Sequence, residues 1–74
     1  MPQYFFNTSN GSPHIDDVGM ELPDIGAARR EAVRYGGSLL SDDPDIAIQD
    51  NGLRIDVIDE AGGHCFAVQV VIEG

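Results

Sequence analysis

The chain has 74 residues, of which 42% are hydrophobic and 23% charged, as is typical of one small globular domain rather than a disordered segment. Its 13 acidic and 4 basic residues give a formal net charge of −9, so it lacks the basic surface with which proteins neutralise nucleic-acid phosphates. The same charge disfavours anionic membranes. We therefore expect neither nucleic acid nor membrane as a partner.

The compartment is inferred from the cysteine content and from the apolar segments. Cys65 is the only cysteine, so no disulfide can form within the chain. No basic region followed by an apolar run begins the sequence, and no apolar stretch approaches the ~20 residues of a membrane helix. We expect a cytoplasmic protein.

The first predicted element is a strand over residues 3–9, where consecutive aromatic residues favour extended structure. Alternation along a strand places Tyr4 and Phe6 on one face and Phe5 on the other. Asn10-Gly11, which follows, is the dipeptide most typical of a two-residue hairpin turn.

A tight turn at Asn10-Gly11 would pair Phe6 with Ile15 and place both side chains on the same face. The second strand, within Pro13–Asp17, is expected to be short and at an edge, because proline cannot donate a hydrogen bond to a neighbouring strand.

The region from Leu22 to Leu40 predicts the one helix of the chain. Asp24 is a favourable N-cap. Gly36-Gly37 weakens the last turn, so the sequence leaves two ends open, one at these glycines and one near Leu40. Apolar residues recur at steps of three and four, which places them on one face. This expected core face consists of Ile25, Ala28, Ala32, Tyr35 and Leu39.

Three of the four basic residues, Arg29, Arg30 and Arg34, lie on the polar side of this helix. Arg34 is three residues after Glu31, a spacing that favours an ion pair. The arginines could bind an anion or an acidic partner. The alternative, a solvated helix face with the aliphatic stems covering apolar neighbours, is the interpretation that we favour.

Two further strands are predicted after a polar loop at Ser41–Asp45. Asn51-Gly52 is a second turn signal and precedes a strand over residues 53–58. A glycine-rich loop over residues 59–63 leads to the last strand, over residues 64–72, whose alternate residues form a continuous apolar face.

These elements predict an α+β fold in the order β-hairpin, helix, β-hairpin (ββαββ), with one four-stranded antiparallel sheet and the helix packed on one face. The whole of residues 1–74 would form this single domain. The reverse face of the sheet would carry Phe5, Ala67 and Val71 among polar residues, and it is either exposed or covered in a dimer.

The motifs Met1–Phe6, Asp16–Asp24 and Ala28–Ala32, followed by the strand at 53–58 and the turn at 59–62, extend over nearly the whole chain. Together they resemble a family of short bacterial proteins catalogued as a domain of unknown function, DUF6894. The resemblance implies the same order of elements and brings no activity. Gly36-Gly37 departs from the family pattern, whose helix usually continues with alanine and leucine.

Metal sites are not supported by the spacing of ligand residues. Asp43 and Asp45 would begin a calcium loop, but its fifth and sixth positions are alanine and isoleucine. His64 and Cys65 are adjacent on a strand and point to opposite faces. A site joining His14 and His64 would require the two hairpins to meet. We expect no metal and no cofactor.

Catalysis is equally unsupported. A nucleophile would need a histidine and an orienting acid beside it, and His64 points away from Cys65. We therefore predict no enzyme activity. A non-catalytic domain that binds a protein partner or a second copy of itself is the favoured function. The expected surface comprises Phe5, Ala67, Val71, Arg29, Arg30 and Arg34.

Two alternatives remain open. An acidic inhibitor or antitoxin-like adaptor would bind a basic partner, by analogy of fold and charge. A small-ligand or metal sensor would use His14, His64 and the acidic loops.

Overall fold

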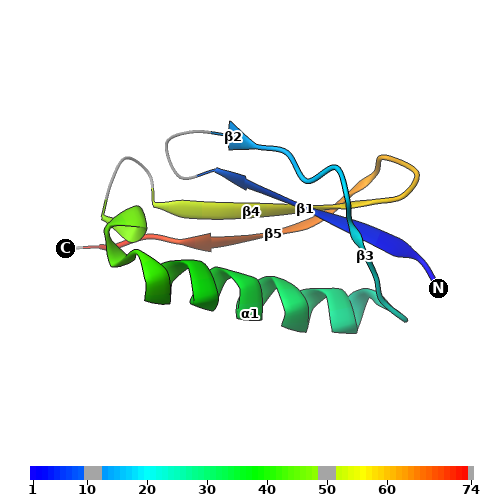
Figure 1. The fold of residues 1–74 in the computed structure, drawn as a ribbon, viewed down its shortest axis with the longest axis horizontal. Helices are drawn as coiled ribbons and strands as arrows, with labels where there is room; N and C mark the ends of the chain where they lie inside the picture. Colours follow the sequence, from blue (N-terminus) through cyan, green and yellow to red (C-terminus); the bar gives the residue numbers. More distant parts are fainter. Residues whose placement is uncertain (10–12, 49–51, 74) are drawn as a thin grey trace.

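The computed structural model describes residues 1–9, 13–48 and 52–73, so the predicted turns at Asn10-Gly11 and Asn51-Gly52 lie wholly or partly outside the described residues. An antiparallel sheet of five strands lies beside one α-helix, which confirms the α+β class (Figure 1). The predicted number of four strands is wrong, because a separate short strand over residues 20–21 follows the second strand and also pairs with the first. Neither helix in the described part could span a membrane.

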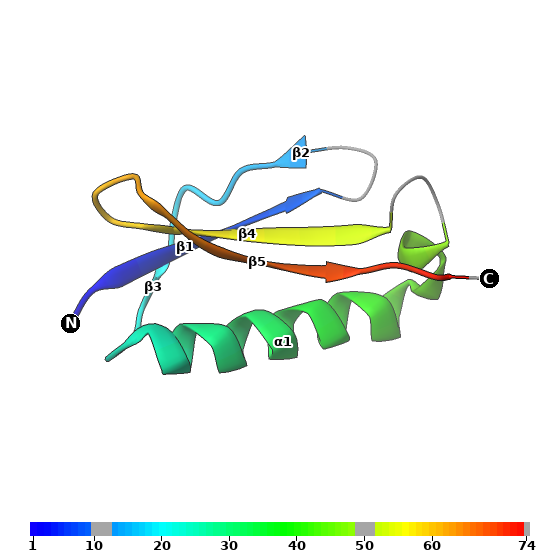
Figure 2. The ribbon, with the colours of Figure 1, turned by 180° about the vertical axis from the view of Figure 1, so that it is seen from behind.

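The strands are β1 (Gln3–Ser9), β2 (Pro13–His14), β3 (Met20–Glu21), β4 (Leu53–Asp59) and β5 (His64–Val70). They lie in the order β2-β1-β4-β5, and β3 also pairs with β1. Since β4 occupies one edge of β1, β2 and β3 follow one another along its other edge. Figure 2 shows β5 next to the helix and β2 on the far side of the sheet.

The first hairpin has a different register from the predicted one. Thr8 pairs with His14, whereas the predicted pairing of Phe6 with Ile15 would place Thr8 opposite Pro13. A shift of one residue turns every side chain of a strand to the other face. Ile15 is accordingly 68% exposed, and its predicted pairing with Phe6 is wrong.

The helix α1 (Ile25–Asp42) begins where the sequence predicts. The Asp24 carboxylate accepts a hydrogen bond from the backbone N–H of Ala27 at 2.8 Å, which satisfies a donor of the first turn. The predicted core residue Ile25 is 40% exposed, so the core face begins one turn later, at Ala28.

Of the two helix ends that the sequence leaves open, the one at Gly36-Gly37 does not occur, because α1 continues through both glycines to Asp42. Gly36 is buried against β4, and a Cβ there would lie 3.2 Å from Ile55 Cδ1. Its lack of a side chain therefore allows the helix to approach the sheet. The predicted loop at Ser41–Asp45 contains the end of α1 and the start of a 3₁₀-helix, η1 (Pro44–Ala47).

The core lies between α1 and the central strands β1 and β4. Its three β4 residues are at most 1% exposed, while the corresponding residues of β5 are only partly buried. The last strand ends at Val70, before the predicted Ile72. The buried apolar residues are Tyr4, Phe6, Ala28, Ala32, Ile46, Leu53, Ile55 and Val57.

Candidate interaction site

The outer edge of β5 is paired with no strand in the described part of the chain. The seven residues His64–Val70 include no aspartate, glutamate, lysine, arginine, proline or glycine. Natural edge strands commonly use such residues, or a bulge, to prevent pairing with another chain. β5 has one register irregularity, opposite Val57 and Ile58 at its hairpin end, and is otherwise an unprotected edge.

An apolar border accompanies this edge on the helix side. Phe66, Val68 and Val70 pack against the core but stay partly exposed. The guanidinium carbon of Arg29 lies 5.8 Å from the centre of the Phe66 ring, so this side of α1 faces β5. Val33, one turn further along the helix, is 63% exposed. We call this set, together with the outer edge of β5, the β5 border.

The reverse face of the sheet holds the predicted residues Phe5 and Ala67, which β4 separates. Phe5 is half-buried, and the backbone of Gly19 packs closely on its ring. A Cβ added at Gly19 would lie only 2.8 Å from Phe5 Cε1. Ala67 is opposite Asp56 and half-buried, while Val71 follows the end of β5 and is 48% exposed.

Between them lies a polar cluster around Asp56. Its Oδ1 atom is 3.1 Å from Arg54 Nη2 and 2.9 Å from His64 Nε2. Partial burial raises the pKa of Asp56, but the hydrogen bonds from Arg54 and His64 outweigh it and hold that pKa below its ordinary value. The reverse face is therefore less apolar than the β5 border.

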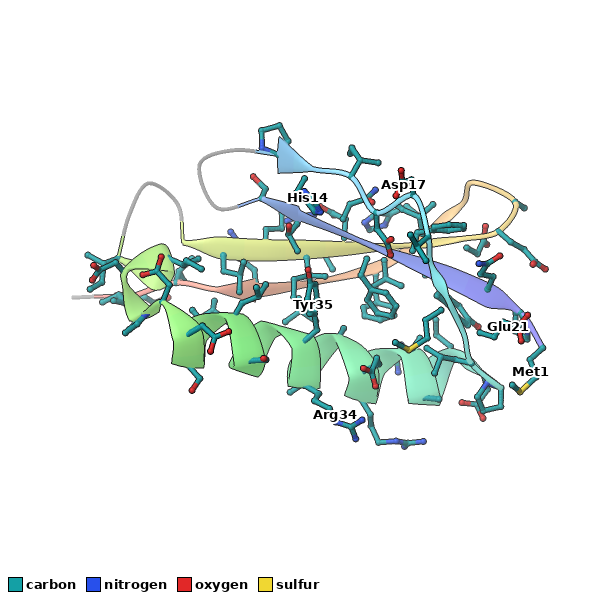
Figure 3. All side chains as sticks on the ribbon, in the orientation of Figure 1. Met1, His14, Asp17, Glu21, Arg34 and Tyr35 are labelled. Carbon is teal, nitrogen blue, oxygen red and sulfur yellow. The ribbon has the colours of Figure 1, made fainter. Side chains whose placement is uncertain are left out.

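The three helix arginines have different neighbours. Arg34 Nη1 lies 3.1 Å from Glu31 Oε2, in the predicted ion pair. Arg34 points away from the sheet, as Figure 3 shows. Arg29 contacts Phe66, and all three arginines surround the exposed Val33 in a shallow surface hollow.

On the opposite edge of the sheet, residues 15–19 connect β2 to β3, and we call them the edge strap. The carboxylate of Asp16 organises it. Oδ2 accepts a hydrogen bond from the backbone N–H of Phe6 at 3.1 Å, and Oδ1 accepts from Val18 at 3.0 Å and Gly19 at 3.1 Å. One side chain thus ties the strap to β1 where no strand pairing exists.

Two further bonds hold the strap. Asn7 Oδ1 accepts from the backbone N–H of Asp16 at 2.9 Å, and Gln3 Nε2 donates to the carbonyl of Val18 at 2.8 Å. Partial burial raises the pKa of Asp16, but its three backbone hydrogen bonds, with a contribution from the charge of His14, lower it below the ordinary value. Our interpretation of the sequence missed this role, although aspartate three residues before a glycine is its local signal.

A hollow of about 300 Å³ lies between the edge strap and α1. Tyr35 projects from the helix toward the sheet beside it (Figure 3). Two apolar side chains at its margin are unusually exposed, Val18 at 75% and Met20 at 42%. We call this hollow the strap groove; its lining residues are Phe6, His14, Asp16, Val18, Gly19, Met20, Glu31 and Tyr35.

The remaining candidate ligands do not converge. His14 is on β2 and His64 on β5, at opposite edges of the sheet. The described residues include no group of three histidine, cysteine, aspartate or glutamate side chains placed to hold a metal ion. Partial burial and the nearby Asp59 charge raise the pKa of the Cys65 thiol, which disfavours the nucleophilic thiolate.

The sequence matches one known protein family over most of its length. The family model described as a domain of unknown function, DUF6894, matches residues 3–71, from the first strand to just beyond the last. The chain belongs to the DUF6894 family. The resemblance inferred from its motifs is confirmed, and the family description assigns no activity to this DUF6894 domain. Comparisons with curated proteins and with solved structures found no significant match.

Proposed function

We propose that this DUF6894 domain is a non-catalytic interaction domain that associates with a second copy of itself through β5. Two β5 strands would pair antiparallel across a two-fold axis and join both sheets into one. The observation that carries the proposal is the open edge of β5, which is seven residues long and has no charged or proline residue to oppose pairing.

The β5 border supports this arrangement energetically. Phe66, Val68 and Val70 are only partly buried on a strand that has no outer neighbour in the described part of the chain, and Val33 of α1 is exposed. A second β5 would cover part of this surface, at about 25 cal/mol for each Å² of apolar area removed from water. A domain of this size buries a small core and gains much from such a partner.

Electrostatics opposes the association only at long range. Each copy has a formal net charge of −9, but β5 contains no aspartate, glutamate, lysine or arginine, and its one histidine, His64, faces Asp56 of the same chain. Repulsion between the separated carboxylates is screened by salt, over a distance of about 10 Å at 0.1 M ionic strength. The contact itself brings no like charges together within the strand.

Substitution of Ala67 by lysine tests the proposal. Ala67 is opposite Asp56 within the same chain, so the new ammonium gains a partner and the fold should persist. Pairing of two such β5 strands would bring like charges close together, and we expect self-association at least about tenfold weaker than native. Ser38→Lys, which adds the same charge on the exposed side of α1, is the control and should associate as the native protein does.

Amide hydrogen exchange, followed by NMR, locates the contact. We expect the outward-facing amides of β5 to become protected as the protein concentration rises, while protection elsewhere stays unchanged. Unchanged exchange along β5 in an associated sample, or native association of the Ala67→Lys variant, would contradict pairing through this edge.

A further inference from the structure

We infer that the strap groove binds a small organic ammonium ion, that is, an amine attached to an apolar ring or short chain. The groove lies on the side of α1 away from β5, and the inference rests on observations independent of the self-association proposed above. It adds a ligand site to a domain whose family description names none.

The size and walls of the groove suit a small ligand. Its volume of about 300 Å³ is at the lower end of the range for small-molecule sites. Phe6, Tyr35, Val18 and Met20 give it mainly apolar walls. The last two keep much of their surface in water, 75% and 42% respectively, so a ligand with an apolar body would cover area that the fold leaves exposed.

The charges of the lining select a cation. Asp16 comes from the edge strap and Glu31 from α1, so a carboxylate is contributed from each side. His14 also lines the groove, but no arginine or lysine does, so with histidine counted as neutral the lining has a formal charge of −2 at pH 7. Glu31 is only 23% exposed at its side chain, and its Oε2 atom receives Arg34, which leaves Oε1 as an acceptor for an ammonium. An anionic ligand would instead meet two carboxylates of its own sign.

The aromatic and sulfur-containing residues favour the same ligand class. The faces of phenyl and phenol rings attract cations, and Phe6 and Tyr35 supply such rings to the lining of the groove. The flexible thioether of Met20 adapts to apolar ligands of different shape. Carboxylates beside aromatic and apolar walls form a suitable environment for an amine with a hydrocarbon body.

One wall of the groove is held in place before any ligand arrives. The edge strap is fixed by the bonds to the Asp16 carboxylate and by the Gln3 amide at the Val18 carbonyl. Gly19, with φ of 76°, adopts a conformation that side chains disfavour, and it packs closely on Phe5. Such a prepared wall reduces the ordering that ligand binding must impose.

The test is a titration of ¹⁵N-labelled protein with 2-phenylethylammonium chloride, followed by NMR at constant ionic strength. We expect saturable shifts of the Val18, Gly19 and Glu31 amides with a millimolar dissociation constant. The matched probes 2-phenylethanol, which is neutral, and phenylacetate, which is anionic, should bind at least about fivefold more weakly. Equal binding of all three probes, or absence of saturable shifts at the groove, would overturn the inference.

A variant pair assigns the charge selectivity. Glu31→Gln keeps the shape of the side chain and removes only an exposed ion pair with Arg34, so the fold should persist. It should weaken binding of the amine about fivefold and leave binding of 2-phenylethanol unchanged. Asp42→Asn, at the exposed end of the same helix, should bind the amine as the native protein does. Native affinity of the Glu31→Gln variant for the amine would contradict the assigned role of Glu31.

Discussion

At the scale of single residues, Asp16 has a structural role that was not predicted from the sequence. Its carboxylate holds the edge strap. Between β2 and β3 the outer edge of β1 has no strand partner, and the Asp16 carboxylate supplies acceptors there. Hydrogen bonds to a charged acceptor are stronger than those between neutral groups. The edge strap, and with it one wall of the strap groove, therefore depends on this side chain.

Replacement of Asp16 by alanine should lower the free energy of unfolding by about 2–3 kcal/mol, because three backbone N–H groups lose their charged acceptor. Asp17→Ala, at the exposed neighbouring position, should change it by less than about 0.5 kcal/mol. Urea unfolding at pH 7 measures both. Equal effects of the two substitutions would show that the Asp16 bonds are not stabilising.

The same side chain predicts a dependence on pH. The pKa of Asp16 is lowered in the folded protein, so its contribution is fully present above the unfolded value of about 3.9 and is lost as the pH falls through the folded pKa. The difference in stability between the native protein and Asp16→Ala should therefore shrink when urea unfolding is repeated at pH 3. A difference that stays constant between pH 7 and pH 3 would contradict this account.

At the scale of elements, the sequence predicted those features that depend only on neighbouring residues in the chain. The N-cap at Asp24 and the strand beginning at Leu53 lie where the sequence places them, because capping and alternation depend on neighbours in the chain. The end of the helix stayed open between Gly36-Gly37 and Leu40. Gly36 lies within the helix and packs closely on Ile55, a residue brought near only by the fold, and no local pattern reveals that contact.

The two glycines of α1 should respond differently to alanine. Gly37 has open space around it, so Gly37→Ala should stabilise the protein by about 0.5–1 kcal/mol through helix propensity. Gly36→Ala places a methyl group against Ile55 Cδ1 in the core, and the contact should cancel that gain or reverse its sign. Thermal or urea unfolding measures both. Equal stabilisation by the two substitutions would contradict the close packing assigned to Gly36.

The candidate surfaces were only partly predictable for the same reason. Ala67 and Arg29 were candidates from sequence, and both belong to β5 or its border with α1. Strand order depends on contacts between distant segments, so the sequence did not reveal that β5 is an open edge. The strap groove was missed because the register of the first hairpin, which determines where His14 lies, differs by one residue from the predicted register.

At the scale of the whole molecule, the two edges of the sheet differ. One is covered by β2, the edge strap and β3, while the other, β5, has no partner within the described chain. Only one edge of the described sheet is therefore open to another chain. A single open edge favours pairing of two copies, because a pair leaves no further edge for open-ended assembly. β5 is therefore the edge at which we propose a two-fold interface.

The most direct test is the solution mass of the native protein by light scattering, across a range of concentrations and at two salt levels. We predict a mass that approaches twice that of one chain as concentration rises, with tighter association at the higher salt, since salt screens the repulsion between two chains of net charge −9. A single-chain mass at every concentration and at both salt levels would contradict self-association through β5.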